Sequence, residues 1–471
     1  MYLLNITIRI FPDSTGRYDD VPGLVGESGV VIPLVLYFSE KYNEYSLATL
    51  EKIREAFTLF WNYSSANPPS ECFGSENGSF KNAIQHFINF RKAIIHGTFS
   101  AETGADSSGL AWRPSSIAKA NWVISKLSDF FEWADSRGAR DAQRFNPTAT
   151  PSRYAALVMR AAYEQKRSNA FLGHTWAAAK DRQLTGRTVS NTRGPKAAPR
   201  EPARFPDVHF SRLLKEGFTT RDATSLRDCL LAILLNKGGL RESEPMHLWV
   251  IDVTQDPSTK GALVVIRHPS QGTAPTGPQG RRYSNREDYL ARVYNLRPRN
   301  LVVGPLHAGW KSAFVSIEVQ WFEPVWGLRF WELWKRYLHL LSRVPRNHPY
   351  AFIVFNGETR GRPIPIDTFY EAHTAAVYRA GLVPRVGAVR LKSLGLTAHG
   401  HRHAYGHRAK NMAGLDTVIV QGMLHHSSPN SQNAYTQLTR EERRMLLSQA
   451  SERMHVPDQW DDSIIGQNKQ S

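Results

Sequence analysis

TAHGHRHAYGHRAKNMAGLDTVIVQGMLHHSSPNSQNAYTQLT, residues 397–439, is the stretch around which the rest of the chain is organised. It contains six of the seventeen histidines, together with Arg402 and Tyr435. A second short segment, GGLRES at 238–243, supplies Arg241 at the end of an apolar helical pattern. These residues could form a metal site, a phosphate site or a pair of polar helices, and the surrounding sequence decides between the three.

The length and charge of the chain limit the number of its domains and the kind of partner that it binds. A chain of 471 residues is too long for one compact core and favours two domains. A hydrophobic fraction of 41% and 12 tryptophans indicate globular structure, and no apolar run approaches the ~20 residues that span a bilayer. The formal charge of +17 favours a polyanionic partner, nucleic acid first. A merely basic surface and binding to anionic lipid are the alternatives, but no basic amphipathic anchor is present.

The cysteines and the N-terminus indicate the compartment. Cys72 and Cys229 are the only two cysteines, which excludes a disulfide framework and a cysteine-based zinc module. The segment MYLLNITIRI lacks the basic region and the small-residue cleavage site of a signal peptide. We therefore expect a cytoplasmic protein without membrane association, located at the nucleoid if its source is bacterial.

The N-terminal part is expected to be an arm followed by a helical domain. Within residues 1–45, the apolar runs 3–10 and 29–38 are predicted to be strands or an extended arm, separated by the turn-rich segment 13–23. From Ser46, a helix N-cap, the apolar periodicity becomes helical and predicts a helical core DNA-binding domain over 46–180. The expected helices begin after Ser46, run over 81–95, follow Pro114 as far as Gly138, and cover 152–170.

A basic linker, residues 181–206, is expected to join this domain to the next one. It is rich in Pro, Gly, Thr and Arg and has no apolar periodicity. Such a segment is either a solvated tether or a stretch that lies along a phosphate backbone. The candidate DNA-binding residues are Arg182, Arg187, Arg193, Lys196 and Arg200.

Residues 207–456 are predicted to form the second domain, mainly helical with a small antiparallel sheet. Asp207 is the expected N-cap of its first helix, and the predicted strands are 261–268 and 312–322. Further helices are expected over 326–343 and 367–380. The C-terminal tail, 457–471, carries Trp460, Ile464 and Ile465 and is either a frayed terminus or a segment that docks on a neighbouring protomer.

The histidine spacing raises the possibility of a metal site. His403 and His407 are four residues apart, as zinc ligands on a helix are, but the residues between them include no glutamate base. Carboxylates and cysteines are missing from this neighbourhood, so we expect neither metal nor cofactor. The remaining combination of cationic groups, histidines and one tyrosine is typical of phosphoryl transfer.

The motifs carry a resemblance to one family. GGLRESE at 238–244 resembles the first box of the tyrosine recombinases, also called phage-type integrases. HGHRH at 399–403 is similar to their His-x-x-Arg-His box, and LHHSSPNSQNAY at 424–435 is similar to their Leu-Gly-His-Ser-Ser box with its tyrosine. The resemblance covers about 204–450 and implies a two-domain clamp on duplex DNA.

The resemblance also implies roles for individual residues. Arg241 and Arg402 would bind the non-bridging oxygens of the scissile phosphate, and His426 would add a hydrogen bond. His399 would assist proton transfer, and Tyr435 would attack phosphorus to give a 3′-phosphotyrosine. The covalent route conserves the phosphodiester energy, so it needs neither ATP nor metal.

The family's remaining catalytic group is a lysine in a β-hairpin that acts as general acid. The short turn where it would be expected contains no lysine, because a long insertion delays the second strand. Lys311 is our candidate and Lys260 is the alternative. In supporting roles, Glu244 is expected to orient Arg241, and His403 to support its helix through a hydrogen bond.

Two positions depart from the family pattern. His425 stands where the family usually has glycine, which would alter the turn before His426. His401 replaces a common apolar residue inside the second box, so the packing there must differ. Neither change removes a catalytic group.

The resemblance implies site-specific recombination or integration of a mobile element, with duplex DNA as substrate. Four protomers would assemble on two DNA sites, with accessory or directionality factors as further partners. A type IB topoisomerase or a telomere resolvase would use the same groups. A catalytically silent DNA-binding accessory protein and a metal-dependent hydrolase are alternatives of other classes.

Overall fold

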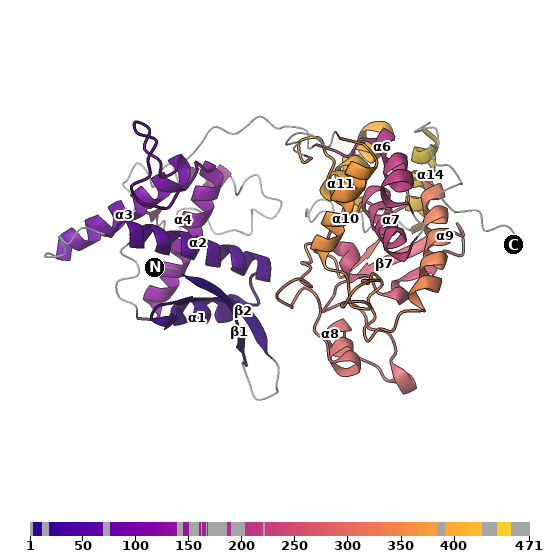
Figure 1. Ribbon diagram of the computed structural model, residues 1–471, viewed down its shortest axis with the longest axis horizontal. Coiled ribbons are helices and arrows are strands. Elements are labelled where there is room, and N and C mark those ends of the chain that lie inside the picture. The colour runs from indigo at the N-terminus through magenta and orange to yellow at the C-terminus, as the bar shows by residue number, and fades with distance from the viewer. Residues whose placement is uncertain are drawn as a thin grey trace. The chain divides into compact units, whose positions relative to one another are not determined.

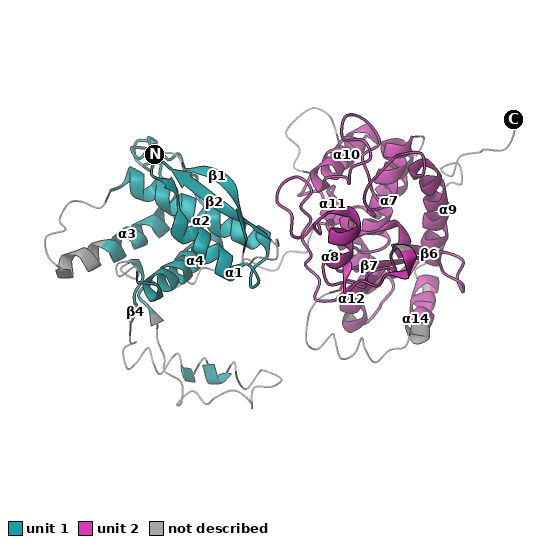
Figure 2. Cartoon of the chain, turned by 90° about the horizontal axis from the view of Figure 1, so that it is seen from below, with its two compact units in different colours: residues 1–198 teal, residues 199–471 magenta. Residues whose placement is uncertain are grey.

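The computed structural model describes the following residues: 3–11, 18–68, 76–138, 145–149, 160–161, 163–165, 167, 186–189, 203–219, 222–383, 391–425 and 440–453. The chain divides into two compact units, Met1–Ala198 and Pro199–Ser471 (Figure 2). Both units are mainly helical with small antiparallel sheets, which confirms the predicted fold class. Within the described residues, no helix combines the length and apolar character needed to cross a membrane.

The first unit begins with a three-stranded antiparallel sheet. Strand β1 (Leu4–Ile10) pairs along its whole length with β2 (Asp19–Gly26), which in turn pairs with the short β3 (Gly29–Val30). The strand expected over 3–10 is therefore confirmed. The turn expected over 13–23 is wrong from Asp19 onward, because that part of the chain is the partner of β1.

The strand expected over 29–38 is confirmed only at Gly29–Val30, which form β3, and is wrong from Ile32 onward. Residues Ile32–Lys41 form helix α1, with Pro33 in its first turn. Proline in the first helical turn loses no hydrogen bond, and its fixed φ suits the helix. The nearly continuous apolar run hid the helical period, since both a buried strand and a buried helix produce such a run.

Three long helices complete the core of the first unit (Figure 1), as the periodicity predicted. They are α2 (Leu47–Ala66), α3 (Glu76–His96) and α4 (Ile117–Ser136). Ser46 caps α2 by accepting a hydrogen bond from the Thr49 amide, and Ser116 caps α4 in the same way. Their inward faces meet in a cluster of aromatic rings around Phe60, whose ring contacts Phe87, Phe90, Phe131 and Phe145.

The second unit is built around the buried helix α7 (Ala223–Asn236). Every residue of α7 from Leu226 onward is buried, and the helix packs against α9 (Pro324–Leu341) and α11 (Ala398–His407). Before it, α6 (Asp207–Arg212) runs into a π-helical turn, Leu213–Phe218, that packs against α10 (Ile366–Arg379). Pro206 rather than Asp207 is the N-cap of α6, so that expectation was wrong by one residue. The helices α12 (Thr417–Met423) and α14 (Arg440–Arg453) follow α11.

The sheet of the second unit has three short antiparallel strands in the order β6 (Val253–Gln255), β7 (Ala262–Arg267) and β8 (Ser316–Glu318). Strand β7 confirms the prediction for 261–268. The strand expected over 312–322 is reduced to three residues, and β6 was not predicted. The segment 268–315 between β7 and β8 contains the one-turn helix α8 (Arg286–Tyr289).

Candidate active site

The backbone of the GGLR segment brings Arg241 to the end of α7. Gly239 adopts φ +69°, and a Cβ atom there would lie 2.5 Å from the ring of Tyr405. Both the left-handed conformation and the close ring contact require glycine at this position. The buried Leu240 follows and fixes the segment in the core, which leaves Arg241 partly exposed with 19% of its side-chain surface accessible.

Glu244 holds Arg241 in place. One oxygen of the Glu244 carboxylate accepts a hydrogen bond from Nη1 of Arg241 at 2.7 Å, and the other accepts from the Arg241 backbone amide at 2.7 Å. Glu244 is completely buried, so its charge requires a partner of this kind. The ion pair that the sequence suggested is present, and it orients the guanidinium group without covering it.

Arg402 approaches the same place from α11. The Thr397 hydroxyl caps this helix by accepting a hydrogen bond from the Gly400 amide. Arg402 is buried, and its guanidinium group donates to the carbonyl oxygens of Gly239 and Leu424. Burial lowers the pKa of Arg402 to about 10, so the group still carries its charge at neutral pH.

The two arginines meet at one turn of the chain. Nη2 of Arg241 donates to the carbonyl oxygen of His425 at 3.2 Å, and Arg402 donates to the carbonyl oxygen of the residue before it, Leu424. His425 has φ +54°, a backbone conformation that favours glycine, which is the residue that the family pattern has at this position. The fold thus joins segments 184 residues apart in sequence at the position directly before His426.

His399 and His403 are the more exposed neighbours of Arg402 on α11. His399 is exposed, His403 is partly buried, and their ring centroids are 4.6 Å apart with nearly perpendicular planes. Burial lowers the pKa of His403, and the positive charges of His399 and Arg402 lower it further. His403 therefore contacts His399 through its ring.

A cavity of about 550 Å³ opens beside these histidines. Its wall includes His399, His403, Lys392, Tyr370 and Glu242. The Tyr370 hydroxyl donates a hydrogen bond to Glu242 at 2.8 Å, and burial together with that carboxylate raises the pKa of Tyr370. No sequence motif pointed to Tyr370, which comes from α10, or to Lys392, which lies seven residues before His399.

The two candidate lysines occupy different surroundings. Lys311 is exposed, and the chain two residues before it is attached to the motif segment, because the Ser243 hydroxyl donates to the Gly309 carbonyl at 2.6 Å. Lys260 lies in the turn between β6 and β7 with φ +60°. That turn is tied to α14, since Arg444 binds the side chains of Asp256 and Ser258.

His401 is part of the core. It is fully buried and stacks on the ring of Phe205 at a centroid distance of 4.1 Å. Its Nδ1 is 2.9 Å from the Asn236 side-chain nitrogen, and its Nε2 is 2.8 Å from Nε2 of His373. The amide nitrogen can only donate, so His401 accepts at Nδ1 and donates at Nε2. This is the changed packing expected from a histidine at an apolar position.

Several candidate residues lie outside the part of the chain that the structure describes. They are His426, Tyr435, Arg182, Arg193, Lys196 and Arg200, together with the tail 457–471 and most of the helix expected over 152–170. Within the described residues, no group of three or more His, Cys, Asp or Glu side chains is arranged to hold a metal ion.

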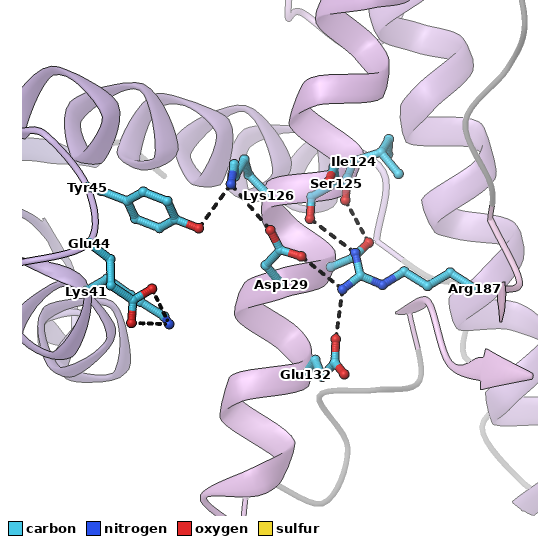
Figure 3. Close-up of polar contacts among 10 residues, drawn as sticks. Lys41, Glu44, Tyr45, Ile124, Ser125, Lys126, Asp129, Glu132 and Arg187 are labelled. Carbon is cyan, nitrogen blue, oxygen red and sulfur yellow. Dashed lines mark hydrogen bonds and ion pairs between the residues drawn. The ribbon is translucent and has the colours of Figure 1, made fainter. Parts of the chain in front are cut away.

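Arg187 is the one candidate DNA-binding residue of the linker that the structure describes, in the short strand β5 (Gly186–Arg187). Its Nη2 lies 2.9 Å from Asp129 and 2.8 Å from Glu132, both on α4 (Figure 3). Its Nη1 also donates to the Ser125 carbonyl at 3.4 Å. Arg187 would have to give up two ion pairs to bind a phosphate.

The chain was compared with known proteins. No family model matches it, and no curated protein sequence matches it. Among solved structures, it is similar to an integrase from mycobacterium phage Brujita, with 15% identity and a TM-score of 0.30 over 92% of this chain and 96% of that one. A lambda integrase (75-356) dimer bound to a COC′ core site matches with 11% identity and a TM-score of 0.36 over 84% and 94%. XerA recombinase matches with 14% identity and a TM-score of 0.30 over 89% and 97%.

Proposed function

We propose that the chain is a site-specific DNA recombinase of the tyrosine type, an integrase that cleaves and rejoins DNA for a mobile element. The observation that carries the proposal is the meeting of Arg241 and Arg402 at the turn before His426. Two guanidinium groups beside one turn suit the two non-bridging oxygens of a phosphodiester, because each has five N–H groups and, among the described residues, only two of its nitrogen atoms donate within the protein. The motif resemblance supplies the remaining groups.

In the proposed reaction, Tyr435 attacks the scissile phosphorus in line with the bond to the 5′ oxygen. The bond between the tyrosine oxygen and phosphorus forms while the bond from phosphorus to the 5′ oxygen breaks. The phenolic proton passes to His399, and Lys311 gives a proton to the departing 5′ oxygen. Attack by a 5′ hydroxyl of the partner strand then reverses each step and releases the tyrosine.

Charge on the phosphoryl oxygens increases in the transition state, and the arginines stabilise it there. Arg402 is suited to this role because its burial removes competing water, while its own hydrogen bonds go to uncharged carbonyl groups. His426 adds a further hydrogen bond to the same oxygens. In this proposal Glu244 orients Arg241, and His403 holds the His399 ring by the contact between them.

The other parts of the chain contribute DNA binding and assembly. The first unit and the basic linker would hold the duplex opposite the catalytic unit, as a clamp. Arg182, Arg193, Lys196 and Arg200 would bind backbone phosphates. Four protomers would join two DNA sites for strand exchange.

The test uses a duplex with a nick close to the cleavage position. Cleavage then releases a short fragment that carries the 5′ hydroxyl, and once this fragment dissociates the covalent intermediate cannot be resealed. The nicked duplexes are selected from the junctions of the element that carries the gene. The wild-type protein should form a DNA adduct that survives denaturation, and Tyr435→Phe should bind the same DNA without forming it. Persistence of the adduct in Tyr435→Phe would show that another residue is the nucleophile.

The products separate the recombinase from other enzymes with the same chemistry. A recombinase exchanges strands between two labelled sites, whereas a type IB topoisomerase relaxes supercoiled circles and a telomere resolvase makes hairpin ends. Cleavage should be unchanged in EDTA, because the proposed reaction needs no metal. Relaxed circles without exchanged strands would move the assignment to the topoisomerase reaction.

A further inference from the structure

The segment between β7 and β8 is far longer than the connection requires. Strands β7 and β8 are antiparallel neighbours, a pair that two to five residues can join. Residues 268–315 stand between their last and first paired positions. In Figure 1, α8 of this segment lies below β7, at the lower edge of the second unit. We refer to residues 268–315 as the insertion.

Two buried arginines fix the insertion to the body of the unit. Arg286 is fully buried, forms an ion pair with Asp252, and its guanidinium carbon lies 4.0 Å from the centre of the Trp249 ring. Arg299 donates to the carbonyl oxygens of Leu306, Met246 and Ile364 at 2.9, 3.0 and 2.8 Å. The insertion is therefore a folded part of the unit with a defined position.

The base of the insertion lies at the proposed active site. Gly309 accepts the hydrogen bond from Ser243, which is two residues from Arg241. Lys311 belongs to the same base. Any duplex whose phosphate is bound by Arg241 therefore passes the point where the insertion leaves the unit.

The insertion is basic at its surface. It contains seven Lys and Arg residues against Glu287 and Asp288. Arg286 and Arg299 are buried, and the other five cations are exposed or partly exposed. Asp288 is already bound by Arg292 at 2.5 Å, so little acidic charge remains to oppose the cations. A surface of this kind attracts phosphates through counterion release.

Two of the exposed cations, Arg281 and Arg282, lie on a compact loop. The Gly277 amide donates to the Arg281 carbonyl at 2.9 Å, which closes the loop. Gly277 approaches the Tyr283 ring so closely that a Cβ atom would lie 2.4 Å from it. The Arg281 guanidinium carbon is 5.7 Å from the centre of the same ring. The backbone of residues 277–283 therefore holds both arginines at the surface at low entropic cost.

We infer that the 277–283 loop is a second DNA-binding surface, which contacts backbone phosphates of the duplex beside the cleavage site. This rests on the proposed function for the position of the duplex. Arg281 and Arg282 bind one phosphate each, and these contacts add affinity without reading the sequence. The insertion thereby lengthens the bound stretch of DNA beyond the phosphate held by Arg241 and Arg402.

The experiment measures binding of the full chain to a 40-base-pair duplex of arbitrary sequence, by fluorescence anisotropy over a series of salt concentrations. The double variant Arg281→Gln, Arg282→Gln should lower the slope of log affinity against log salt by about 1.8, since each lost phosphate contact removes about 0.9. At 0.1 M salt this corresponds to a loss of affinity of up to about 60-fold. The matched control, Lys335→Gln with Arg343→Gln, removes two exposed cations at α9 and just after it, and should leave the slope unchanged.

An unchanged slope in the insertion variant would overturn the inference, and so would an equal decrease in both variants, which would indicate a general effect of net charge. An unchanged slope with an altered sedimentation coefficient would assign the loop to contact with a second copy of the chain instead. The adduct assay with Tyr435→Phe is independent of these outcomes. If the wild-type protein forms no adduct through Tyr435, the salt-slope measurement still tests the loop. If the slope does not change, the adduct assay still tests the proposed function.

Discussion

Arg402 and Arg408 are two buried arginines six residues apart, on α11 and its continuation, and their partners differ in kind. Arg408 binds the carboxylate of Asp207 and lies 3.3 Å from a carboxylate oxygen of Glu323. Arg402 donates to the carbonyl oxygens of Gly239 and Leu424, and the nearest carboxylate, Glu244, is engaged by Arg241.

The difference separates a structural arginine from one available for a ligand. The charge of Arg408 is neutralised inside the protein, so it stabilises the fold and attracts no anion. The charge of Arg402 is only partly compensated, because carbonyl dipoles satisfy its hydrogen bonds without cancelling its charge. A phosphate would supply the missing negative charge. Helical periodicity does not distinguish the two residues, since both are arginines on one helical segment, and only the motif resemblance singled out Arg402.

The largest predicted effect is on stability, from Arg408→Ala. Removing the guanidinium group leaves Asp207 without this ion pair and the buried site without its packing, while Glu323 keeps its ion pair with Lys237. We expect a loss of about 3 kcal/mol in the free energy of unfolding. Urea unfolding followed by tryptophan fluorescence measures it. Arg408→Lys retains the charge and should lose less. A variant Arg408→Ala as stable as the wild type would refute the structural role.

The next effect is on cleavage, from Arg402→Lys. Lysine keeps the charge but loses the planar fork, so we expect cleavage of the nicked duplex to slow by about 10²-fold. The urea midpoint should stay near that of the wild type. Arg408→Lys is the matched control and should cleave at nearly the wild-type rate. Equal loss of rate in both variants would mean that the two arginines do not differ in function.

The third effect is on the pH dependence of stability, and it concerns the buried histidine pair between α10 and α11. Burial lowers the pKa of His373 to about 4, while the unfolded chain takes up a proton near 6.5. The stability contributed by the neutral pair of His373 and His401 is complete above about pH 6.5 and decreases as the pH falls towards 4. We expect His373 to contribute a loss of up to about 1.4 kcal/mol per pH unit within that window. Burial lowers the pKa of His401 as well, so its protonation opposes folding in the same direction.

Urea titrations at pH 7, 6 and 5 measure this decrease. The variant His373→Leu removes one of the two titrating groups and should flatten the curve. The control is His399→Leu, which replaces an exposed histidine on α11, the helix of His401, and should leave the curve unchanged. A curve that His373→Leu does not flatten would show that the buried pair is not responsible.

The smallest effect is expected from His425→Gly. The residue adopts φ +54°, and relief of this conformation should raise stability by up to about 1 kcal/mol. The carbonyl groups that receive Arg241 and Arg402 remain, so binding of DNA should be unchanged. A large loss of stability would instead show that the His425 side chain holds the turn.

The helices could be predicted because their signals are local. Ser46 and Ser116 cap helices whose apolar residues repeat at helical spacing, and the structure has both helices. The strand prediction for 29–38 was wrong from Ile32 onward because an unbroken apolar stretch shows neither the helical nor the strand period. Pro33 was the signal that favoured a helix. The strand expected over 312–322 was overestimated because β-branched residues fit an extended chain whether or not a partner strand is beside them.

In the site, contacts between residues close in sequence could be predicted, and contacts between distant segments could not be predicted from spacing. The ion pair of Arg241 with Glu244 spans three residues, so spacing alone suggested it. The approach of Arg241 to His425 joins residues 184 apart, and only the motif resemblance implied it. The pairing of Arg286 in the insertion with Asp252 in the body of the unit had no sequence signal, because a buried arginine looks like an exposed one in sequence.

The central claim is that Tyr435 forms a covalent bond with the DNA at a phosphate held by Arg241 and Arg402. The most direct measurement is mass spectrometry of the peptides from a trapped adduct on the nicked duplex, after nuclease and protease digestion. We predict that the peptide containing Tyr435 carries the 3′-linked nucleotide through its phenolic oxygen. A nucleotide on any other residue, or no covalent adduct with DNA, would contradict the claim.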